Sequence, residues 1–563
     1  MKKLFLTLNL VTVLAILNAG AKEWPKHLSD RIDSLVSLQH SEGQPGGVIA
    51  ILSGEEVMLT KSYGLMDIEQ NKPNDLNTTF DIASVAKQFT AFAIMLLEEE
   101  GKLELDKDIR VYLPKLPEYE YTITVRNLLQ HTSGIASTDV LRLFAGLSFD
   151  ELWNQQKEIE LIGQYSHLNF KPNTSHVYSN SGYSLLAQIV EVASRMSFPD
   201  YLESKIFIPA GMKSAVVYSD PTLKLVNNST GYKMVEGKAV KVSSTTDYSY
   251  GSSNIYMNLN DMICWGQNFI SPKAGNAAMI KRILNPYNTL ENGDSIFYTY
   301  GFNVRKYKGV KMVEHSGGVP GFRNQFMIFP DDNLIIILMF NNESINTRRL
   351  ANGIADILLS DKIIEEISKP RIAVEYDPGK ILRLSGNYQM EDGMELSFEV
   401  KKDTFWLVLP DAARFQLFAE NEYKFFIKAF DAQCTFIPAQ NGEVNNMIWH
   451  QGGGDYKAIR VENKVLLSAE ELARYAGTYY QKDLRVEYPL ICENGKLSLS
   501  TPPTFLNYLG FDAVELNHIN GDKFLTDKFG VLEFTRDENN HVNGFVLLDV
   551  GRLQNLRFSL LSE

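Results

Sequence analysis

The sequence predicts an α+β protein: an antiparallel sheet flanked by helices, followed by two small antiparallel β-barrel-like domains. Three observations support this fold class. Residues 46–64 alternate like a β-hairpin and precede an apolar helical stretch, which is typical of a sheet with helices packed on it. Residues 300–341 contain further hairpins, and the chain after Pro370 consists of short alternating segments that occur twice. With 563 residues the chain is also too long for one core.

The first residues have the pattern of a secretory signal peptide. Met1-Lys2-Lys3 is followed by an apolar stretch from Leu4 to Leu17 and by Ala19-Gly20-Ala21. This order combines the basic start, apolar core and small-residue cleavage site of such a signal. A membrane anchor is the alternative, but the apolar stretch is short for a span and no later stretch is long enough. We therefore expect removal of residues 1–21, a periplasmic or secreted location, and no stable membrane insertion.

Charge and composition narrow the partners and cofactors. The formal net charge is −13 and the chain has no basic tract, which argues against nucleic acid and anionic membranes as partners. Cys264, Cys434 and Cys492 are widely spaced, and the nine histidines lack the short spacings of a zinc site. We expect no metal and no cofactor. The cysteines are interpreted as buried apolar residues, with a 434–492 disulfide as the less favoured alternative.

The first predicted elements are a helix, a hairpin and a second, buried helix. Lys22 to Leu38 is amphipathic, and residues 46–52 and 56–64 alternate with a turn between them. The apolar run after Phe80 ends near Gly101, which suits a helix stop. A hairpin beside a buried helix places the helix against one face of a sheet.

The only Ser-x-x-Lys of the sequence, Ser84 to Lys87, opens this buried helix. Residues i and i+3 share a helix face, so the hydroxyl and the amine lie side by side. The helix N-terminus adds partial positive charge, and a buried lysine loses its proton more readily because desolvation disfavours the charged form. The pattern predicts a serine nucleophile with its own base, although this spacing alone more often marks a surface pair.

Two helical segments are predicted next, over residues 123–134 and 137–165. Thr124 has the character of an N-cap, and Gly134 suits a left-handed stop. His131, near the end of that helix, is expected to satisfy backbone carbonyls rather than to react. The mixed segment 137–165 is typical of a cover over a cleft.

Tyr178 and Asn180 are the next candidates. They lie in a loop with Pro and Asn just before an apolar helix over residues 184–194, a position where catalytic groups are common. A second Tyr-x-Asn, Tyr256 to Asn258, lacks the Pro-rich approach and is interpreted as non-catalytic.

Glycines lie between two predicted hairpins near residue 315. The strands of these hairpins are residues 300–306, 310–315, 323–329 and 334–341. His315-Ser316-Gly317-Gly318 lies between the second and third of them. Glycines at a strand end let a ligand or another backbone approach closely. A closing helix is expected over residues 348–367.

The tail after Pro370 contains an internal repeat. Leu384-Ser-Gly386-Asn-Tyr388 recurs as Tyr475-Ala-Gly477-Thr-Tyr479, and the segments that follow take the same order. Two copies of roughly 90 residues, each a set of antiparallel strands, indicate two small closed or curled sheets. Neither copy offers a nucleophile and a base, so we expect packing, dimerisation or ligand-holding modules.

Three motifs together resemble a known family. Ser84-Val-Ala-Lys87, Tyr178-Ser-Asn180 and His315-Ser-Gly317 occur in this order and in suitable elements. In these motifs the chain resembles the serine β-lactamase and penicillin-binding-protein superfamily, in its class C β-lactamase, D-amino-acid peptidase and carboxylesterase branch. The resemblance covers about residues 25–360. The tail is similar to the lipocalin-like modules often appended in this family.

The resemblance implies a role for each candidate. Ser84 attacks an acyl carbon, Lys87 with Tyr178 takes its proton, and Tyr178 passes the proton to the leaving group. Asn180 orients the substrate amide. The N–H groups of Ser84 and Gly318 form the oxyanion hole, whose donors are worth about 3 kcal/mol each.

The chain also departs from the family pattern. His315 stands where many β-lactamases have Lys, and an imidazole holds a substrate carboxylate less firmly than an ammonium. This residue favours the peptidase or esterase side of the branch. Asn173 and the pair Ser252-Ser253 stand where the family often has Gly; neither site is expected to touch the chemistry.

These expectations define the domains and the function. We expect a hydrolase domain over residues 22–369 and β modules over 370–465 and 466–563. The expected protein is a secreted serine acyl hydrolase that forms an acyl-enzyme on Ser84 from an ester, a D-amino-acid amide or peptide, or a β-lactam. The alternative is a penicillin-binding sensor or a cell-wall peptide-binding protein without turnover. Expected partners are a small-molecule or peptide substrate and a second copy of the chain, bound through the C-terminal modules.

Because the six assigned residues all lie at or before Gly318, a chain ending near Lys369 is expected to keep a complete active site.

Overall fold

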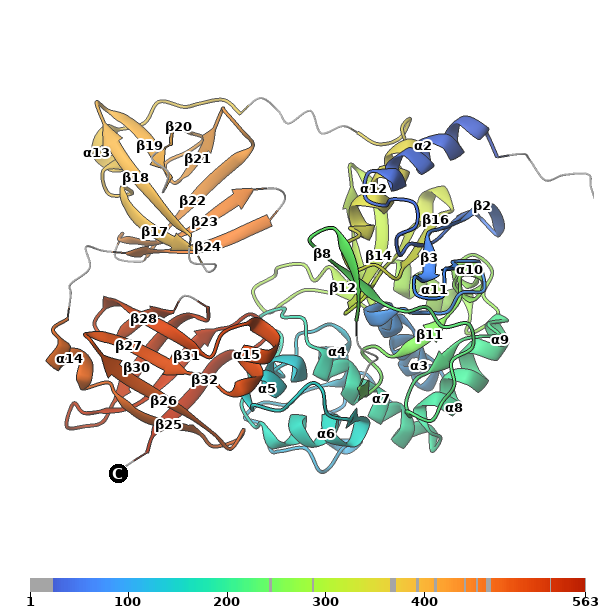
Figure 1. Cartoon of the computed structure of the whole chain (residues 1–563), viewed down its shortest axis with the longest axis horizontal. Coiled ribbons are helices and arrows are strands. Elements are labelled where there is room, and N and C mark those ends of the chain that lie inside the picture. The colour runs from blue at the N-terminus through green and yellow to red at the C-terminus, as the bar shows by residue number, and fades with distance from the viewer. Residues whose placement is uncertain are drawn as a thin grey trace, which may run out of the picture.

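A computed structural model describes residues 24–242, 246–285, 288–364, 371–390, 394–409, 413–439, 442–451, 454–461, 467–526 and 528–561. The predicted signal peptide lies outside the described residues. The α+β class is confirmed, as an N-terminal domain with a helix-flanked antiparallel sheet, followed by two closed barrels (Figure 1).

A seven-stranded sheet forms the centre of the N-terminal domain, in the order β12-β13-β14-β15-β16-β1-β2. Its strands are β1 (Gly47–Ser53), β2 (Glu56–Tyr63), β12 (Tyr298–Thr299), β13 (Phe302–Tyr307), β14 (Val310–Val319), β15 (Phe322–Phe329) and β16 (Leu334–Phe340). The pairing of β1 with β16 joins the two ends of the domain. All residues of β16 are buried, because helices cover both faces of the sheet, and its unbroken apolar sequence reflects this.

One face of the sheet packs on α2 (Lys26–Ser37) and α12 (Thr347–Leu358). The other face packs on the turn η1 (Ala83–Ala86) and on the helices α3 (Lys87–Glu99) and α10 (Leu259–Asn268). The remaining helices of this domain are η2 (Ile109–Val111), α4 (Val125–Leu129), α5 (Thr138–Phe144), α6 (Gln155–Gln164), α7 (Asn180–Ser194), α8 (Phe198–Leu202), η3 (Glu203–Phe207), α9 (Ile208–Ala210), α11 (Ala277–Leu284) and η4 (Pro330–Asp332). The short strands are β3 (Leu65–Asp67), β4 (Lys72–Pro73), β5 (Phe80–Asp81), β6 (Trp153–Asn154), β7 (Val216–Val217), β8 (Tyr232–Val235), β9 (Lys238–Lys241), β10 (Asp247–Tyr248) and β11 (Ile255–Met257).

The two tail modules are closed eight-stranded barrels. The first comprises α13 (Pro378–Ile381), β17 (Gly386–Met390), β18 (Glu395–Lys401), β19 (Thr404–Val408), β20 (Arg414–Ala419), β21 (Lys424–Ile427), β22 (Ala432–Pro438), β23 (Val444–Gln451) and β24 (Gly454–Val461). The second comprises α14 (Ala469–Ala473), β25 (Gly477–Gln481), β26 (Val486–Glu493), β27 (Lys496–Ser500), α15 (Pro503–Leu509), β28 (Ala513–Asn520), β29 (Lys523–Thr526), β30 (Gly530–Arg536), β31 (Val542–Asp549) and β32 (Gln554–Leu560).

The sequence repeat has a common structural basis in the two barrels. The Tyr388 hydroxyl donates to the carbonyl of Leu384 at 3.1 Å, and the Tyr479 hydroxyl donates to the carbonyl of Tyr475 at 2.6 Å. The glycine between each pair, such as Gly386 with φ 142°, has a backbone conformation that favours glycine. Each copy therefore begins with the same turn, in which a tyrosine hydroxyl is hydrogen-bonded to the carbonyl four residues before it.

Aromatic side chains fill the interior of the first barrel. The rings of Phe398, Phe405, Phe425 and Phe436 are at most 2% exposed, and neighbouring centroids lie 5.1–6.0 Å apart. The interior of the first barrel is therefore filled by its own side chains, which gives no support to a ligand-holding role inside this module.

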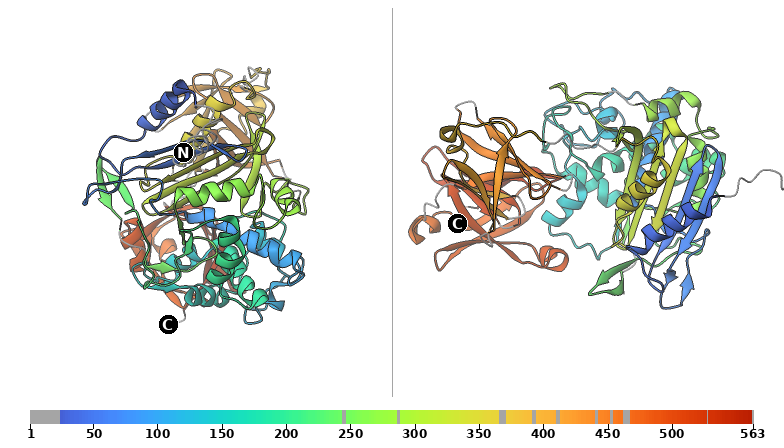
Figure 2. Two further views of the ribbon diagram at one scale, coloured as in Figure 1. Left: turned by 90° about the vertical axis from the view of Figure 1, so that its right-hand side faces the viewer. Right: turned by 90° about the horizontal axis from the view of Figure 1, so that it is seen from above.

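The second barrel packs directly on the N-terminal domain, while the first lies beside the second (Figures 1 and 2). Phe144 at the end of α5 is 2% exposed, and its ring contacts those of Phe505 and Phe529 in the barrel at 5.2 and 5.3 Å. The Tyr488 hydroxyl donates to the Phe144 carbonyl at 2.9 Å. The segment 137–165, expected to cover a cleft, is therefore the platform on which this barrel docks.

The cysteines are all unpaired, so the 434–492 disulfide is absent. Within the part of the chain that the structure describes, no group of three or more His, Cys, Asp and Glu side chains is placed to hold a metal ion. In the same ranges no helix has both the length and the apolar character needed to cross a membrane.

Candidate active site

Ser84 lies in η1, one turn before α3, against the sheet. The preceding residue, Ala83, has φ 51°, which is costly for a residue with a Cβ atom. Its N–H donates to Oδ1 of the buried Asp81 at 2.8 Å. This local arrangement turns the chain sharply from β5 into the helix and fixes Ser84 at the turn.

Lys87 is fully buried, and its amine joins three segments of the chain. Nζ lies 3.1 Å from Ser84 Oγ, 2.9 Å from Asn180 Oδ1 and 2.8 Å from the carbonyl oxygen of Ser252. A neutral amine has two N–H groups and one lone pair. The two N–H groups match the two carbonyl acceptors, which directs the lone pair to the Ser84 hydroxyl.

The electrostatics favour this neutral form. Burial lowers the pKa of Lys87 well below its ordinary value, and the positive charge of Arg552 lowers it further, while Asp139 opposes the shift. Desolvation is therefore the main reason that this lysine is a base near neutral pH.

Tyr178 and Asn180 lie at the start of α7. The N–H of Asn180 donates to Ser137 Oγ at 2.9 Å, which fixes the end of the helix that faces Lys87. The Tyr178 hydroxyl is buried and has no partner of normal hydrogen-bond geometry in the described ranges. Burial raises the pKa of this phenol, and the nearby Ser84 side chain only partly offsets the rise.

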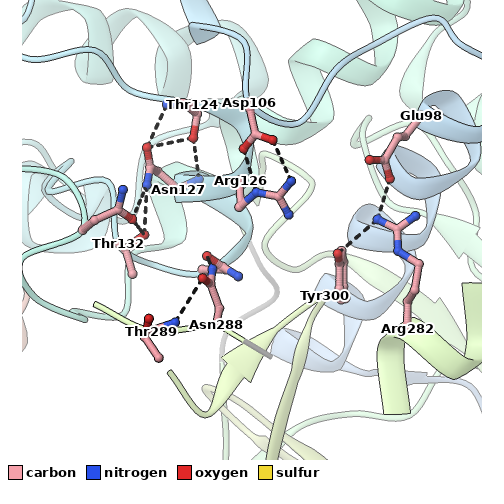
Figure 3. Close-up of polar contacts among 12 residues, drawn as sticks. Glu98, Asp106, Thr124, Arg126, Asn127, Thr132, Arg282, Asn288, Thr289 and Tyr300 are labelled. Atoms are coloured by element: carbon pink, nitrogen blue, oxygen red, sulfur yellow. Dashed lines mark hydrogen bonds and ion pairs between the residues drawn. The ribbon is translucent and has the colours of Figure 1, made fainter. Parts of the chain in front are cut away.

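A polar network holds the loop that leads to Tyr178. Thr124 and Asn127 form a capping box at α4, and Asn127 Nδ2 also donates to Thr132 Oγ1 at 3.2 Å (Figure 3). The same amide donates to Asn173 Oδ1 at 2.7 Å. Asn173 has φ 66°, a conformation that Asn tolerates better than most residues with a side chain, so this position does not require glycine.

The glycines of β14 bring this strand close to the nucleophile. The pairing of β14 with β13 ends at Glu314, so residues 315–319 have one edge free of β13. A Cβ atom on Gly317 would lie 2.3 Å from the carbonyl oxygen of Ile82. Glycine is therefore required for the approach of β14 to η1, which places Gly318 beside the Ser84 turn.

His315 has protein partners at both ring nitrogens. Nδ1 lies 2.6 Å from the Ser316 carbonyl oxygen and Nε2 lies 2.9 Å from the Tyr298 hydroxyl. A carbonyl only accepts, so Nδ1 carries the proton and Nε2 accepts from tyrosine. Burial lowers the pKa of His315 to about 4. The ring is therefore neutral at neutral pH, and both of its polar atoms are engaged inside the protein.

His131 has a structural setting that differs from the predicted one. Its Nδ1 accepts the N–H of Ser179 at 3.2 Å instead of donating to a helix carbonyl. Its ring packs on Tyr178 and Tyr298, with centroids 4.3 and 4.4 Å away. Burial lowers its pKa well below the ordinary value, so the ring supports the tyrosine loop as a neutral group.

Two further expectations concern the region around residue 255. The backbone of Ser252 contacts the Lys87 amine, so the expectation that this pair does not touch the chemistry is wrong. Tyr256 in β11 lies opposite Asp81 in the neighbouring strand β5. The Asp81 carboxyl interacts with the Tyr256 hydroxyl. Tyr256 therefore belongs to the small sheet β5-β11-β7, and Asn258 is the N-cap of α10.

Sequence reasoning also missed Arg552. It lies between β31 and β32 of the second barrel, with its Cζ 4.9 Å from the ring centroid of Tyr178. Its Nη1 donates to Asp139 Oδ2 at 2.9 Å. A chain ending near Lys369 would therefore lack a side chain that contacts Tyr178. No sequence motif marks this arginine, because only the docking of the barrel brings it to Tyr178.

Comparisons with known proteins identify the family of this chain. The family profile described as Beta-lactamase matches residues 31–359. "Penicillin-binding protein 4*" of Bacillus subtilis is 26% identical over 78% of this chain and 99% of the relative. A "D-aminopeptidase" of Brucella anthropi is 31% identical over 53% of this chain and 56% of the relative, so the match spans about half of that protein.

Solved structures show the same fold. The octameric penicillin-binding protein homologue from Pyrococcus abyssi has a TM-score of 0.54 and 22% identity, and the match covers 77% of this chain and 99% of that one. The hydrolase EstCE1 has a TM-score of 0.51 and 19% identity over 59% of this chain and 98% of that one. With the profile covering more than half of its length, the chain belongs to the beta-lactamase family of serine hydrolases.

Proposed function

We propose that this protein is an exported acyl hydrolase that cleaves D-amino-acid amides or peptides through an acyl-enzyme on Ser84. The observation that carries the proposal is the placement of the Lys87 amine between Ser84, Asn180 and Ser252. The D-amino-acid substrate class is supported by the relatives named D-aminopeptidase. Export is supported by the signal-like N-terminus of the sequence.

The proposed steps use the groups that lie around Ser84. The neutral Lys87 amine takes the Ser84 proton while Oγ attacks the substrate carbonyl carbon. The N–H groups of Ser84 and Gly318 receive the negative charge that develops on the carbonyl oxygen. Asn180 orients the substrate amide beside the amine to which it is hydrogen-bonded.

Tyr178 acts as the proton donor to the leaving group. Because burial raises its pKa, the phenol keeps its proton at neutral pH and Lys87 is the base. The leaving amine departs with this proton, and Lys87 returns one to Tyr178. Water then attacks the carbonyl carbon of the acyl-enzyme, and the same groups transfer the protons in the opposite direction.

A substrate screen with a burst measurement tests the proposal. Purified protein is assayed with D-alanine amide, D-alanyl peptides, p-nitrophenyl acetate and nitrocefin, beside Ser84→Ala. We expect steady turnover of at least one D-amino-acid substrate and loss of turnover in the variant. Hydrolysis of D-amino-acid substrates by Ser84→Ala at near the wild-type rate would contradict the mechanism.

Binding of penicillin without turnover is the second candidate function, favoured by the match to penicillin-binding protein 4* over 99% of that relative. A sensor would release one equivalent of product from an activated substrate and then stop, whereas an enzyme continues. Export is tested separately: the mature protein should begin near Lys22, and an uncleaved N-terminus would contradict that part.

A further inference from the structure

The loop between β31 and β32 is locked onto the N-terminal domain through its backbone. The carbonyl of Arg552 accepts from the Ser137 N–H at 3.3 Å and from Asn169 Nδ2 at 3.0 Å. Asn169 Oδ1 in turn accepts the N–H of Gln554 at 2.9 Å. Ser137 also accepts from the Asn180 N–H, so the barrel loop connects directly to the start of α7.

The side chain of Arg552 points from this anchor toward the reacting groups. Its Cζ lies 4.9 Å from the Tyr178 ring centroid, and the Lys87 amine lies 4.8 Å from the same centroid. One edge of the guanidinium donates to Asp139 at 2.9 Å, while the Arg552 side chain remains 42% exposed. A guanidinium has five N–H donors, so this contact leaves donors for a ligand in the cleft.

Arg552 supplies a positive charge beside Tyr178, where the neighbouring lysine and histidines are buried. Burial favours the neutral forms of Lys87, His131 and His315. Arg323, which lies beside Gly318, donates from Nη1 to the carbonyls of Val319 and Phe322, both at 2.7 Å. Arg323 is also a cation, but it lies beside Gly318, whereas the guanidinium of Arg552 lies against the ring of Tyr178.

We propose that Arg552 binds a carboxylate on the leaving-group side of the substrate and so makes the second barrel part of the specificity site. The leaving-group side follows from Tyr178, because the arginine stacks on the ring whose hydroxyl protonates the leaving amine. The planar fork of a guanidinium suits a carboxylate. The favoured substrate is then a D-residue peptide with a free C-terminal carboxylate directly after the scissile bond.

This inference rests on the proposed function and is tested with matched substrates. Acetyl-D-alanyl-D-alanine is compared with its C-terminal amide, and p-nitrophenyl acetate serves as an ester without a carboxylate. Both peptides are also tested as competitive inhibitors of ester hydrolysis. The proteins are the full-length wild type, Arg552→Gln, Arg552→Lys and the control Arg474→Gln, which removes an exposed arginine from α14.

We expect the wild type to prefer the free acid over the amide in kcat/KM or in inhibition. Arg552→Gln should lose about 10- to 100-fold on the acid, the range for a hydrogen bond to a charged group, and little on the amide. Arg552→Lys should keep part of the preference, and Arg474→Gln all of it.

The possible failures are distinguishable. The inference would be overturned if the wild type showed the same kcat/KM and inhibition for the free acid and the amide. It would also be overturned if the ratio of these values were unchanged in Arg552→Gln. Either result would leave the Ser84 mechanism intact. A preference for the amide would indicate that Asp139 dominates the site and would also overturn it. If no substrate is turned over and Ser84 is not acylated, the proposed function fails and the inference falls with it.

Discussion

Replacing Phe144 by alanine tests whether the second barrel is held firmly enough to form part of the active site. Phe144 is 2% exposed and its ring contacts Phe505 and Phe529 across the domain boundary. Truncating a buried phenylalanine costs about 3–5 kcal/mol, including the cavity left behind. Because 1.36 kcal/mol is a factor of ten, the docked arrangement should weaken by about 10²- to 10⁴-fold relative to the undocked one.

The assay follows docking and selectivity together. Hydrogen exchange reports on the amides of β31 and β32, and denaturant unfolding reports on the free energy of the docked form. In Phe144→Ala we expect faster exchange at this loop, an earlier unfolding step, and a smaller acid-to-amide preference with ester turnover retained. The control Leu152→Ala, at a side chain that is 58% exposed, should change the unfolding free energy by about 0.5 kcal/mol or less. Wild-type exchange and stability within about 1 kcal/mol in Phe144→Ala would refute the reasoning.

Three further predictions concern the groups around the nucleophile. Tyr178→Phe should lower kcat by about 10²- to 10⁴-fold, whereas Tyr256→Phe should affect stability alone; equal losses of kcat would show that the wrong tyrosine was chosen. Gly317→Ala should abolish most activity, because the new Cβ atom would lie 2.3 Å from a backbone oxygen beside the nucleophile. A Cβ atom at position 318 would first meet the flexible side chain of an arginine, at 3.5 Å, so Gly318→Ala should be milder. A smaller loss of activity in Gly317→Ala than in Gly318→Ala would contradict this. Because the charge of Arg552 lowers the pKa of the active-site lysine, Arg552→Gln should move the acid limb of the pH–rate profile to higher pH. A shift to lower pH would contradict the assignment of that lysine as the base.

Local sequence patterns predicted the parts of the site that lie within one element. The Ser-x-x-Lys spacing placed the hydroxyl beside the amine, and their Oγ to Nζ distance is 3.1 Å. The Pro- and Asn-rich approach favours Tyr178 over Tyr256, and only Tyr178 leads into the helix whose Asn180 contacts the Lys87 amine. The order of the three motifs, through the family they resemble, predicted that Asn180 belongs to the site; the structure places its Oδ1 2.9 Å from the Lys87 amine, 93 positions away in the sequence.

The missed features depend on contacts that no local pattern encodes. Ser252 contributes its backbone carbonyl, for which the side chain gives no signal. His315 was assigned to the substrate because of its motif, yet Tyr298 and Ser316 occupy its two nitrogens. Arg552 is 413 positions from Asp139, and the apolar residues of α5 that dock its barrel look like an ordinary amphipathic helix. The docking of the segment 137–165 on the second barrel could not be predicted for the same reason.

Trapping the acyl-enzyme tests the central claim most directly. The full-length protein is incubated with benzylpenicillin or a D-alanyl ester, quenched in acid, digested and mapped by mass spectrometry. The mechanism predicts one adduct of the acyl group, on Ser84, that is absent from Ser84→Ala and forms more slowly in Lys87→Met. An adduct on a different residue, or substrate turnover that persists in Ser84→Ala, would contradict it.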